Sequence, residues 1–168
     1  MLEDALDITE GPIAIRWPKT PAPQVEWTQV GTGTTARKVS GSTENTKDVC
    51  ILAAGKMLSE AVAASEQLKD IGVTVWDPRI LTPLDSEMLD DAKKHKLVVT
   101  VEDGYIEGGF GSLVLGHLNR ENSDCQVLNL GVPLSFHTHN KPDHLLSSFG
   151  LDSTGIVKKI RETISEFE

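Results

Sequence analysis

Apolar and polar residues alternate in regular blocks from residue 48 to the end of the chain. Four short apolar runs, rich in β-branched residues, are typical of strands buried on both faces; they cover 49–54, 73–77, 97–101 and 126–130. Apolar residues at helical spacing predict helices over 56–69, 85–92, 112–118 and 152–167. Asp85 or Ser86, and Asp152, stand where helix N-caps are expected. The alternation predicts an α/β fold, a three-layer αβα sandwich around a mostly parallel, mixed sheet.

The first 47 residues have a different pattern. Residues 1–8 have the spacing of two helical turns, and the apolar run 13–17 predicts a strand that ends at Pro18. From Lys19 to Lys47 the chain is rich in Pro, Gly, Thr, Ser and Asn, which is typical of a linker, with one candidate strand at 36–39. Residues 40–47 are the segment we expect to be disordered.

The stretch 97–112 joins a buried strand to a helix through an acidic turn that contains four glycines, Gly104, Gly108, Gly109 and Gly111. Turns of this kind bind dinucleotides in many α/β proteins. Here the G-x-G-x-x-G pattern is absent, and the acidic pair before the turn would repel a pyrophosphate. We therefore interpret the glycines as positions that let the helix pack tightly on the sheet or on another subunit.

That acidic pair, Glu102 and Asp103, provides two candidates for general acid–base chemistry. Adjacent residues of a strand point to opposite faces of the sheet, so the pair does not form one catalytic dyad. We interpret both as solvated or interface carboxylates.

Three histidines near the end of the chain, His137, His139 and His144, are candidate zinc ligands. Cys50 and Cys125 lie far from them in apolar runs, and no acidic ligand falls at a suitable helical spacing, which disfavours a metal site. We expect both cysteines to be buried free thiols, which suits a reducing compartment. No apolar run reaches the length of about 20 residues that crosses a bilayer, and the chain does not begin with a signal segment, so we expect a cytoplasmic protein.

The formal net charge of −9 argues against a nucleic-acid partner held by phosphate contacts. The sequence shows no Ser-His-Asp elbow and no Walker loop, so its motifs alone do not define a complete active site. Arg16, near the end of the first apolar run, is either half of a surface salt bridge or a cation that meets an anion.

Several segments, taken together, resemble one enzyme family, 1-deoxy-D-xylulose-5-phosphate synthase. The segment at 11–19 resembles the end of that family's pyrimidine-binding domain. Five further segments match its C-terminal domain in order and spacing. In chain order, the six segments are GPIAIRWPK at 11–19, ILAAGKM at 51–57, DPRILTPLD at 77–85, VTVEDGYIEGGFGS at 99–112, NLGVPLSF at 129–136 and FGLDSTGI at 149–156.

The resemblance implies an architecture and an activity. Residues 1–20 would be the end of the pyrimidine-binding domain, 21–47 a linker, and 48–168 a domain like the C-terminal domain of transketolase. The family is a homodimer that uses thiamine diphosphate and Mg²⁺. It condenses pyruvate with glyceraldehyde 3-phosphate, with loss of CO₂, to give an isoprenoid precursor.

The family's metal motif and cofactor-activating glutamate belong to its two earlier domains and have no counterpart in this sequence. The chain is therefore expected to support dimer assembly and to bind neither cofactor nor metal alone. Its partners would be the rest of its own enzyme, a second subunit and the two small substrates.

One residue of the family's substrate site is present. Arg16 matches the arginine that holds the phosphate of the aldehyde substrate, whereas Lys19 replaces a more usual second arginine. The loop 136–140 departs from the family's F-x-P-H-G pattern, although His139 keeps the histidine.

Two alternatives remain open at this point. The chain could be the equivalent domain of a transketolase or of a 2-oxoacid dehydrogenase β subunit, because those relatives share this domain in looser form. It could also be a non-catalytic α/β module that recognises a partner through an acidic face around Glu102 and Asp103.

Overall fold

The computed structural model describes residues 2–18, 33–41 and 48–166. The chain forms two compact units, Met1–Thr35 and Ala36–Glu168. Most of the segment predicted to be disordered, and the linker before residue 33, lie outside the described residues.

In the first unit, the predicted short helix is present as α1 (Leu2–Leu6). The strand predicted at 13–17 is wrong, because these residues belong to no strand and are all exposed. A strand is held by hydrogen bonds to a neighbouring strand, and none of the strands in the described part of the chain pairs with this segment.

The second unit contains one sheet of five strands in the order β1-β3-β2-β4-β5. The strands are β1 (Arg37–Ser40), β2 (Val49–Ala53), β3 (Val73–Asp77), β4 (Leu97–Tyr105) and β5 (Gln126–Val132). Strands β2 to β5 are parallel, and β1 pairs antiparallel with β3 at one edge. The mostly parallel, mixed sheet predicted from the sequence is confirmed.

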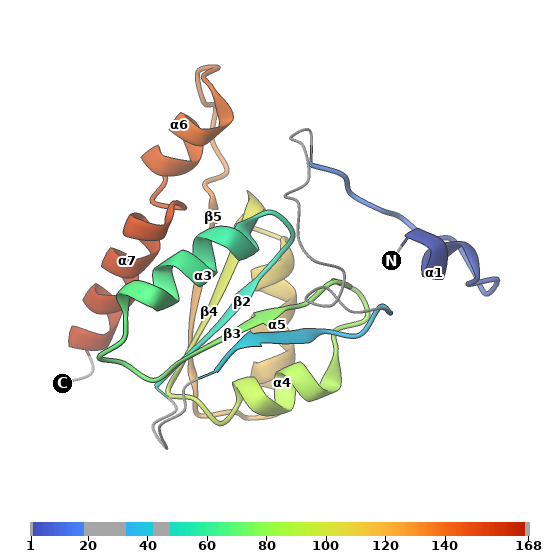
Figure 1. Ribbon diagram of the computed structural model, residues 1–168, viewed down its shortest axis with the longest axis horizontal. Coiled ribbons are helices and arrows are strands. Elements are labelled where there is room, and N and C mark those ends of the chain that lie inside the picture. Colours follow the sequence, from blue (N-terminus) through green and yellow to red (C-terminus); the bar gives the residue numbers. More distant parts are fainter. Residues whose placement is uncertain (1, 19–32, 42–47, 167–168) are drawn as a thin grey trace. The chain divides into compact units, whose positions relative to one another are not determined.

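Helices cover both faces of this sheet (Figure 1). One apolar cluster holds Ile51, Val75 and Val99 together with α3 (Met57–Gln67) and α7 (Ser153–Ser165). The other holds Cys50 and Leu52 with α4 (Ser86–Ala92) and α5 (Phe110–Arg120). Alternate residues of β2 therefore enter opposite layers, as expected for a strand buried on both faces.

Two N-caps predicted from the sequence are formed. Asp85 accepts a hydrogen bond from Met88 N at 2.9 Å, and Asp152 accepts one from Gly155 N at 2.8 Å. Asp85 also accepts a bond from Ala36 N at 3.2 Å, which ties the start of β1 to α4. The helix α6 (Pro142–Ser148) was not predicted, because its seven residues bury no side chain and so show no clear apolar stripe.

Candidate functional site

Strand β2 lies between β3 and β4 in the sheet. The chain therefore adds β3 on one side of β2 and then crosses to the other side to form β4. In doubly wound sheets, ligands bind at the carboxyl ends of the strands beside such a reversal. Two segments meet there in this domain: the loop after β2, which contains Lys56, and residues 102–109, which form the end of β4 and the turn after it. They form the candidate site.

Glu102 occupies the position that a bound anion takes in many α/β domains. Its side chain is buried, with the residue 7% exposed, and its carboxylate accepts hydrogen bonds from Phe110 N at 3.0 Å and Gly111 N at 2.9 Å. These amides begin α5 and have no partner within the helix, and the helix dipole favours a negative charge there. The prediction that Glu102 is a solvated or interface carboxylate is therefore wrong.

The glycines around this carboxylate are required by close packing. A Cβ on Gly109 would collide with the Tyr105 carbonyl oxygen and with the Glu102 carboxylate, and a Cβ on Gly111 would collide with the side chains of Thr100 and Asn129. The interpretation that these glycines let the helix pack tightly on the sheet is confirmed.

Asp103 has a different partner from Glu102. Its carboxylate lies 3.7 Å from Lys56 Nζ, and this ion pair joins the loop after β2 to the end of β4. The two neighbouring carboxylates thus act separately, as expected from their opposite directions on a strand. Neither belongs to an open acidic face, which removes the basis for the partner-binding alternative.

Ser112 closes the glycine-rich turn from inside α5. Its hydroxyl donates to the Ile106 carbonyl oxygen at 2.9 Å and accepts from Gly108 N at 3.0 Å. Sequence reasoning did not assign this residue a role, although a serine one turn into a helix after a glycine loop is a signal for such a bond. The turn is therefore fixed at both ends, by Glu102 and by Ser112.

The histidines do not form a metal centre. His137 Nε2 lies 2.9 Å from the Pro133 carbonyl oxygen, and its ring packs on Phe149 at 4.6 Å between centroids. His139 and His144 are exposed. Over residues 2–18, 33–41 and 48–166, no group of three His, Cys, Asp or Glu side chains is placed to hold a metal ion.

Arg16 is exposed in the first unit. Its role as a phosphate-binding residue stays a prediction.

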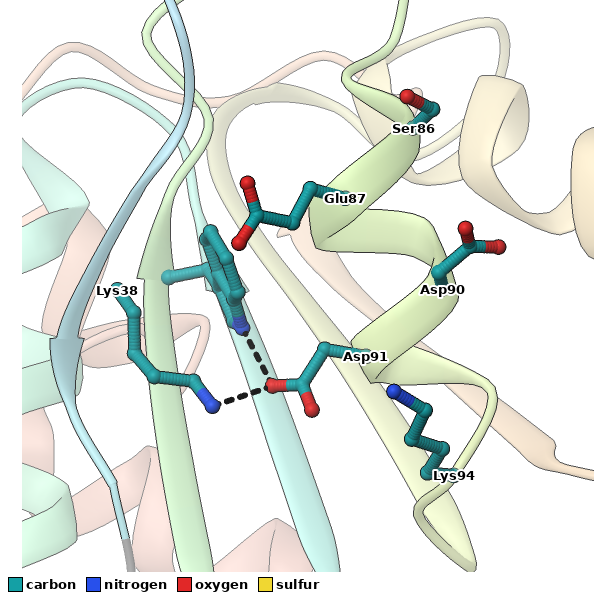
Figure 2. A pocket seen from close by; sticks show the side chains of 7 residues that line it. Lys38, Ser86, Glu87, Asp90, Asp91 and Lys94 are labelled. Carbon is teal, nitrogen blue, oxygen red and sulfur yellow. Dashed lines mark hydrogen bonds and ion pairs between the residues drawn. The ribbon is translucent and has the colours of Figure 1, made fainter.

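A separate hollow of about 450 Å³ lies between β1, β3 and α4 (Figure 2). Within it, Asp91 Oδ2 accepts hydrogen bonds from Lys38 Nζ at 2.7 Å and Trp76 Nε1 at 3.1 Å. Lys38 Nζ also lies 5.5 Å from the centre of the Trp76 ring, a cation–π contact. Because these groups bind one another, we interpret the cluster as a set of contacts that stabilises the packing of β1 at the edge of the sheet.

The fold and the site define a doubly wound α/β domain whose usual ligand position is filled by its own carboxylate. Residues 38–156 match the family model described as the transketolase C-terminal domain. The chain belongs to this family. Among the described helices, none has the length and the apolar character needed to span a membrane.

Curated relatives are similar over nearly the whole chain. The 1-deoxy-D-xylulose-5-phosphate synthase of Thermobifida fusca (strain YX) is 34% identical over 172 aligned positions, which cover 99% of this chain and 26% of that protein. The enzyme of the same name from Synechococcus sp. (strain JA-2-3B'a(2-13)) is 37% identical over 169 positions, covering 96% of this chain and 25% of that protein. The chain thus spans about a quarter of the length of these relatives.

Solved structures share the fold. A split-gene transketolase, described as an inactive beta4 tetramer, superposes with a TM-score of 0.74 at 26% identity, covering 88% of this chain and 48% of that one. The transketolase of Campylobacter jejuni subsp. jejuni NCTC 11168 gives a TM-score of 0.52 at 18% identity, covering 84% of this chain and 20% of that one, and shows the fold alone.

Proposed function

We propose that the chain is the C-terminal part of a 1-deoxy-D-xylulose-5-phosphate synthase, which condenses pyruvate with glyceraldehyde 3-phosphate and releases CO₂. The observation that carries this proposal is the extent of the similarity. The transketolase C-terminal family matches 38–156, whereas the Thermobifida fusca relative matches 99% of the chain and so includes most of the segment before residue 38. That segment contains Arg16 and the motif around it.

The thiamine diphosphate and Mg²⁺ of the proposed reaction would be held by the preceding domains. The described residues of this chain do not fit either group. The amides at the start of α5, which would suit a diphosphate, already bind Glu102, and no cluster of metal ligands is present among the described residues. We therefore assign this chain no step in the cofactor chemistry.

The role of this chain in the enzyme would be structural, with one exception. Its domain would support dimer assembly and the adjoining active site, and Arg16 would bind the phosphate of the aldehyde substrate. A guanidinium recognises phosphate through two parallel charged hydrogen bonds, which supports this role. Cys50 and Cys125 form no disulfide bond in the described part of the chain, which supports a reducing compartment, and we propose the cytoplasm.

The test is reconstitution of a completed enzyme, in which this chain is joined to the preceding domains of the Thermobifida fusca relative. We expect pyruvate-dependent CO₂ release with glyceraldehyde 3-phosphate as acceptor, and none from the preceding domains alone. The natural Thermobifida fusca enzyme serves as the positive control. Activity only with a ketose donor or with lipoamide would instead assign the chain to a transketolase or a 2-oxoacid dehydrogenase.

A further inference from the structure

Strand β1 is attached to the sheet in a different way from the central strands. Every residue of β2 is buried, whereas none of the four residues of β1 is. It lies at the edge of the sheet, and its antiparallel pairing with β3 shifts register between Lys38 and Ser40. A shift of this kind interrupts the ladder of hydrogen bonds between two strands. Apolar burial and regular pairing therefore contribute less to the attachment of β1 than to that of β2.

Three aspartates from β3 and α4 instead hold three consecutive residues at the start of β1. Asp85 accepts a hydrogen bond from Ala36 N at 3.2 Å, Asp77 Oδ2 lies 3.8 Å from Arg37 Nη2, and Asp91 Oδ2 accepts a bond from Lys38 Nζ at 2.7 Å. Figure 2 shows the Lys38 side chain reaching from β1 to Asp91 on α4. Because 43% of the Lys38 side chain is exposed, dissolved salt screens this contact.

The attached position of β1 also leaves one polar group unsatisfied. Ser40 Oγ is buried and has no hydrogen-bond partner among residues 2–18, 33–41 and 48–166. In a detached strand this hydroxyl would bind water, so its burial opposes the attachment of β1. Elements that bury few apolar side chains open at a lower free energy than the core of their domain, and β1 has this character.

We propose that β1 is a strap that opens from the edge of the sheet while β2 to β5 stay folded, and that the Lys38 contact with Asp91 holds it closed. The second unit begins at Ala36, directly before this strand, and its next strand begins at Val49. Opening therefore lengthens the connection between the sheet and the first unit by residues 37–48. The strap sets the length of that connection, and ionic strength shifts the balance between its closed and open states.

The test is native-state hydrogen exchange of the full chain, followed at single amides by NMR. We expect the amides hydrogen-bonded between β1 and β3 to exchange at least about tenfold faster than those between β2 and β4, because the strap opens without global unfolding. Raising NaCl from about 0.05 M to about 1 M should speed exchange in the β1–β3 set by a further factor of about three, because salt screens the Lys38 contact. The β2–β4 set should not respond in this way.

A matched pair of lysine substitutions isolates the contact that holds the strap. Lys38→Met removes the ammonium group but keeps an apolar side chain, and it should speed exchange in the β1–β3 set about tenfold and remove most of the salt effect. Lys158→Met is the control, because Lys158 pairs with Glu162 on α7 and 75% of its side chain is exposed. It should leave both sets of amides as they are in the wild type. Circular dichroism melts confirm that each variant is folded.

Three results would overturn the proposal. The first is a wild type in which the β1–β3 and β2–β4 amides exchange at the same rate, since β1 would then open only when the whole domain unfolds. The second is exchange in the β1–β3 set that responds neither to salt nor to Lys38→Met. The third is a Lys158→Met chain that speeds this exchange as much as Lys38→Met does. None of these measurements uses enzyme activity, so they are independent of the proposed function.

Discussion

At the scale of single residues, the buried carboxylate of Glu102 joins β4 to the start of α5, where it accepts hydrogen bonds from Phe110 N and Gly111 N. Its position after an apolar strand marked it as unusual, but an acidic residue at a strand end is most often solvated. The structure extends β4 to Tyr105, so that Glu102 lies inside the strand and faces α5. The fold brings β4 next to the start of α5, and only this arrangement shows that the Glu102 carboxylate accepts hydrogen bonds from two backbone amides of the same chain.

We expect Glu102→Gln to destabilise the domain by about 1–3 kcal/mol, because the amide side chain removes the charge and one of the two acceptors from a buried site. The measurement is urea unfolding followed by circular dichroism. Glu107→Gln, at an exposed position in the same turn, is the control and should change stability by less than about 0.5 kcal/mol. Equal effects of the two substitutions would contradict the role assigned to Glu102.

Arg16 carries a prediction about the substrate. In the completed enzyme, Arg16→Ala should raise KM for glyceraldehyde 3-phosphate about tenfold or more, which corresponds to loss of a charged hydrogen bond worth about 1.5–3 kcal/mol. KM for pyruvate should change little, because pyruvate has no phosphate group. Steady-state kinetics with each substrate varied in turn gives both values, and an equal change in the two would show that the arginine is structural.

At the scale of elements, the spacing of apolar residues predicted the strands and the long helices of the second unit. It could not predict contacts made by polar side chains. The candidate strand 36–39 lay in a segment that reads as a linker, and it is present as β1. It is held by the Lys38 contacts with Asp91 and Trp76, which no local pattern reveals. The strand predicted at 13–17 failed for the opposite reason, since its pattern was right but no neighbouring strand pairs with it in the described part of the chain.

The packing of α5 on the sheet gives a matched pair of glycine substitutions. Gly111→Ala should destabilise the domain by about 1–3 kcal/mol, because its Cβ would meet the Thr100 and Asn129 side chains beneath the helix. Gly116→Ala lies in the same helix, where the nearest contact is the Arg120 side chain at 3.9 Å, and should be neutral or stabilising by up to about 1 kcal/mol. Thermal unfolding of both variants tests the prediction, which would be refuted if Gly116→Ala were the more harmful.

Asp48 lies just before β2, and its carboxylate accepts hydrogen bonds from residues just before β3 and β4. These hydrogen bonds make the stability of the domain depend on pH. The hydrogen bond from Lys96 Nζ, with a further one from Gly72 N, lowers the pKa of Asp48 below its usual value of 3.8. A carboxyl group whose pKa is lowered by folding stabilises the fold above its unfolded value and loses that contribution as the pH falls through the folded value.

Asp48→Asn should therefore weaken the fall in stability between about pH 5 and pH 3, with less effect on the shape of the profile above pH 5. Urea unfolding at a series of pH values measures this. Asp124→Asn, at an exposed position, serves as the control. If the free energy of unfolding of Asp48→Asn fell in parallel with that of the wild type through this range, the hydrogen bonds of Asp48 would not contribute to the pH dependence.

At the scale of the whole molecule, the features of the described domain are those of a scaffold. The ligand position expected of a doubly wound sheet is filled by Glu102 and bridged by the Lys56–Asp103 pair. The fold class was predictable from the alternation of apolar blocks, and the family from short motifs spread along the chain. The exposure of Phe136 was not predictable, because an exposed phenylalanine cannot be told from a buried one without the fold.

The most direct test of this account is calorimetric titration of thiamine diphosphate with Mg²⁺ into the purified chain and into the completed enzyme. We expect no binding heat from the chain alone and saturable binding by the completed enzyme. Saturable binding of the coenzyme by the isolated chain would show that it contains a cofactor site of its own and would contradict the account.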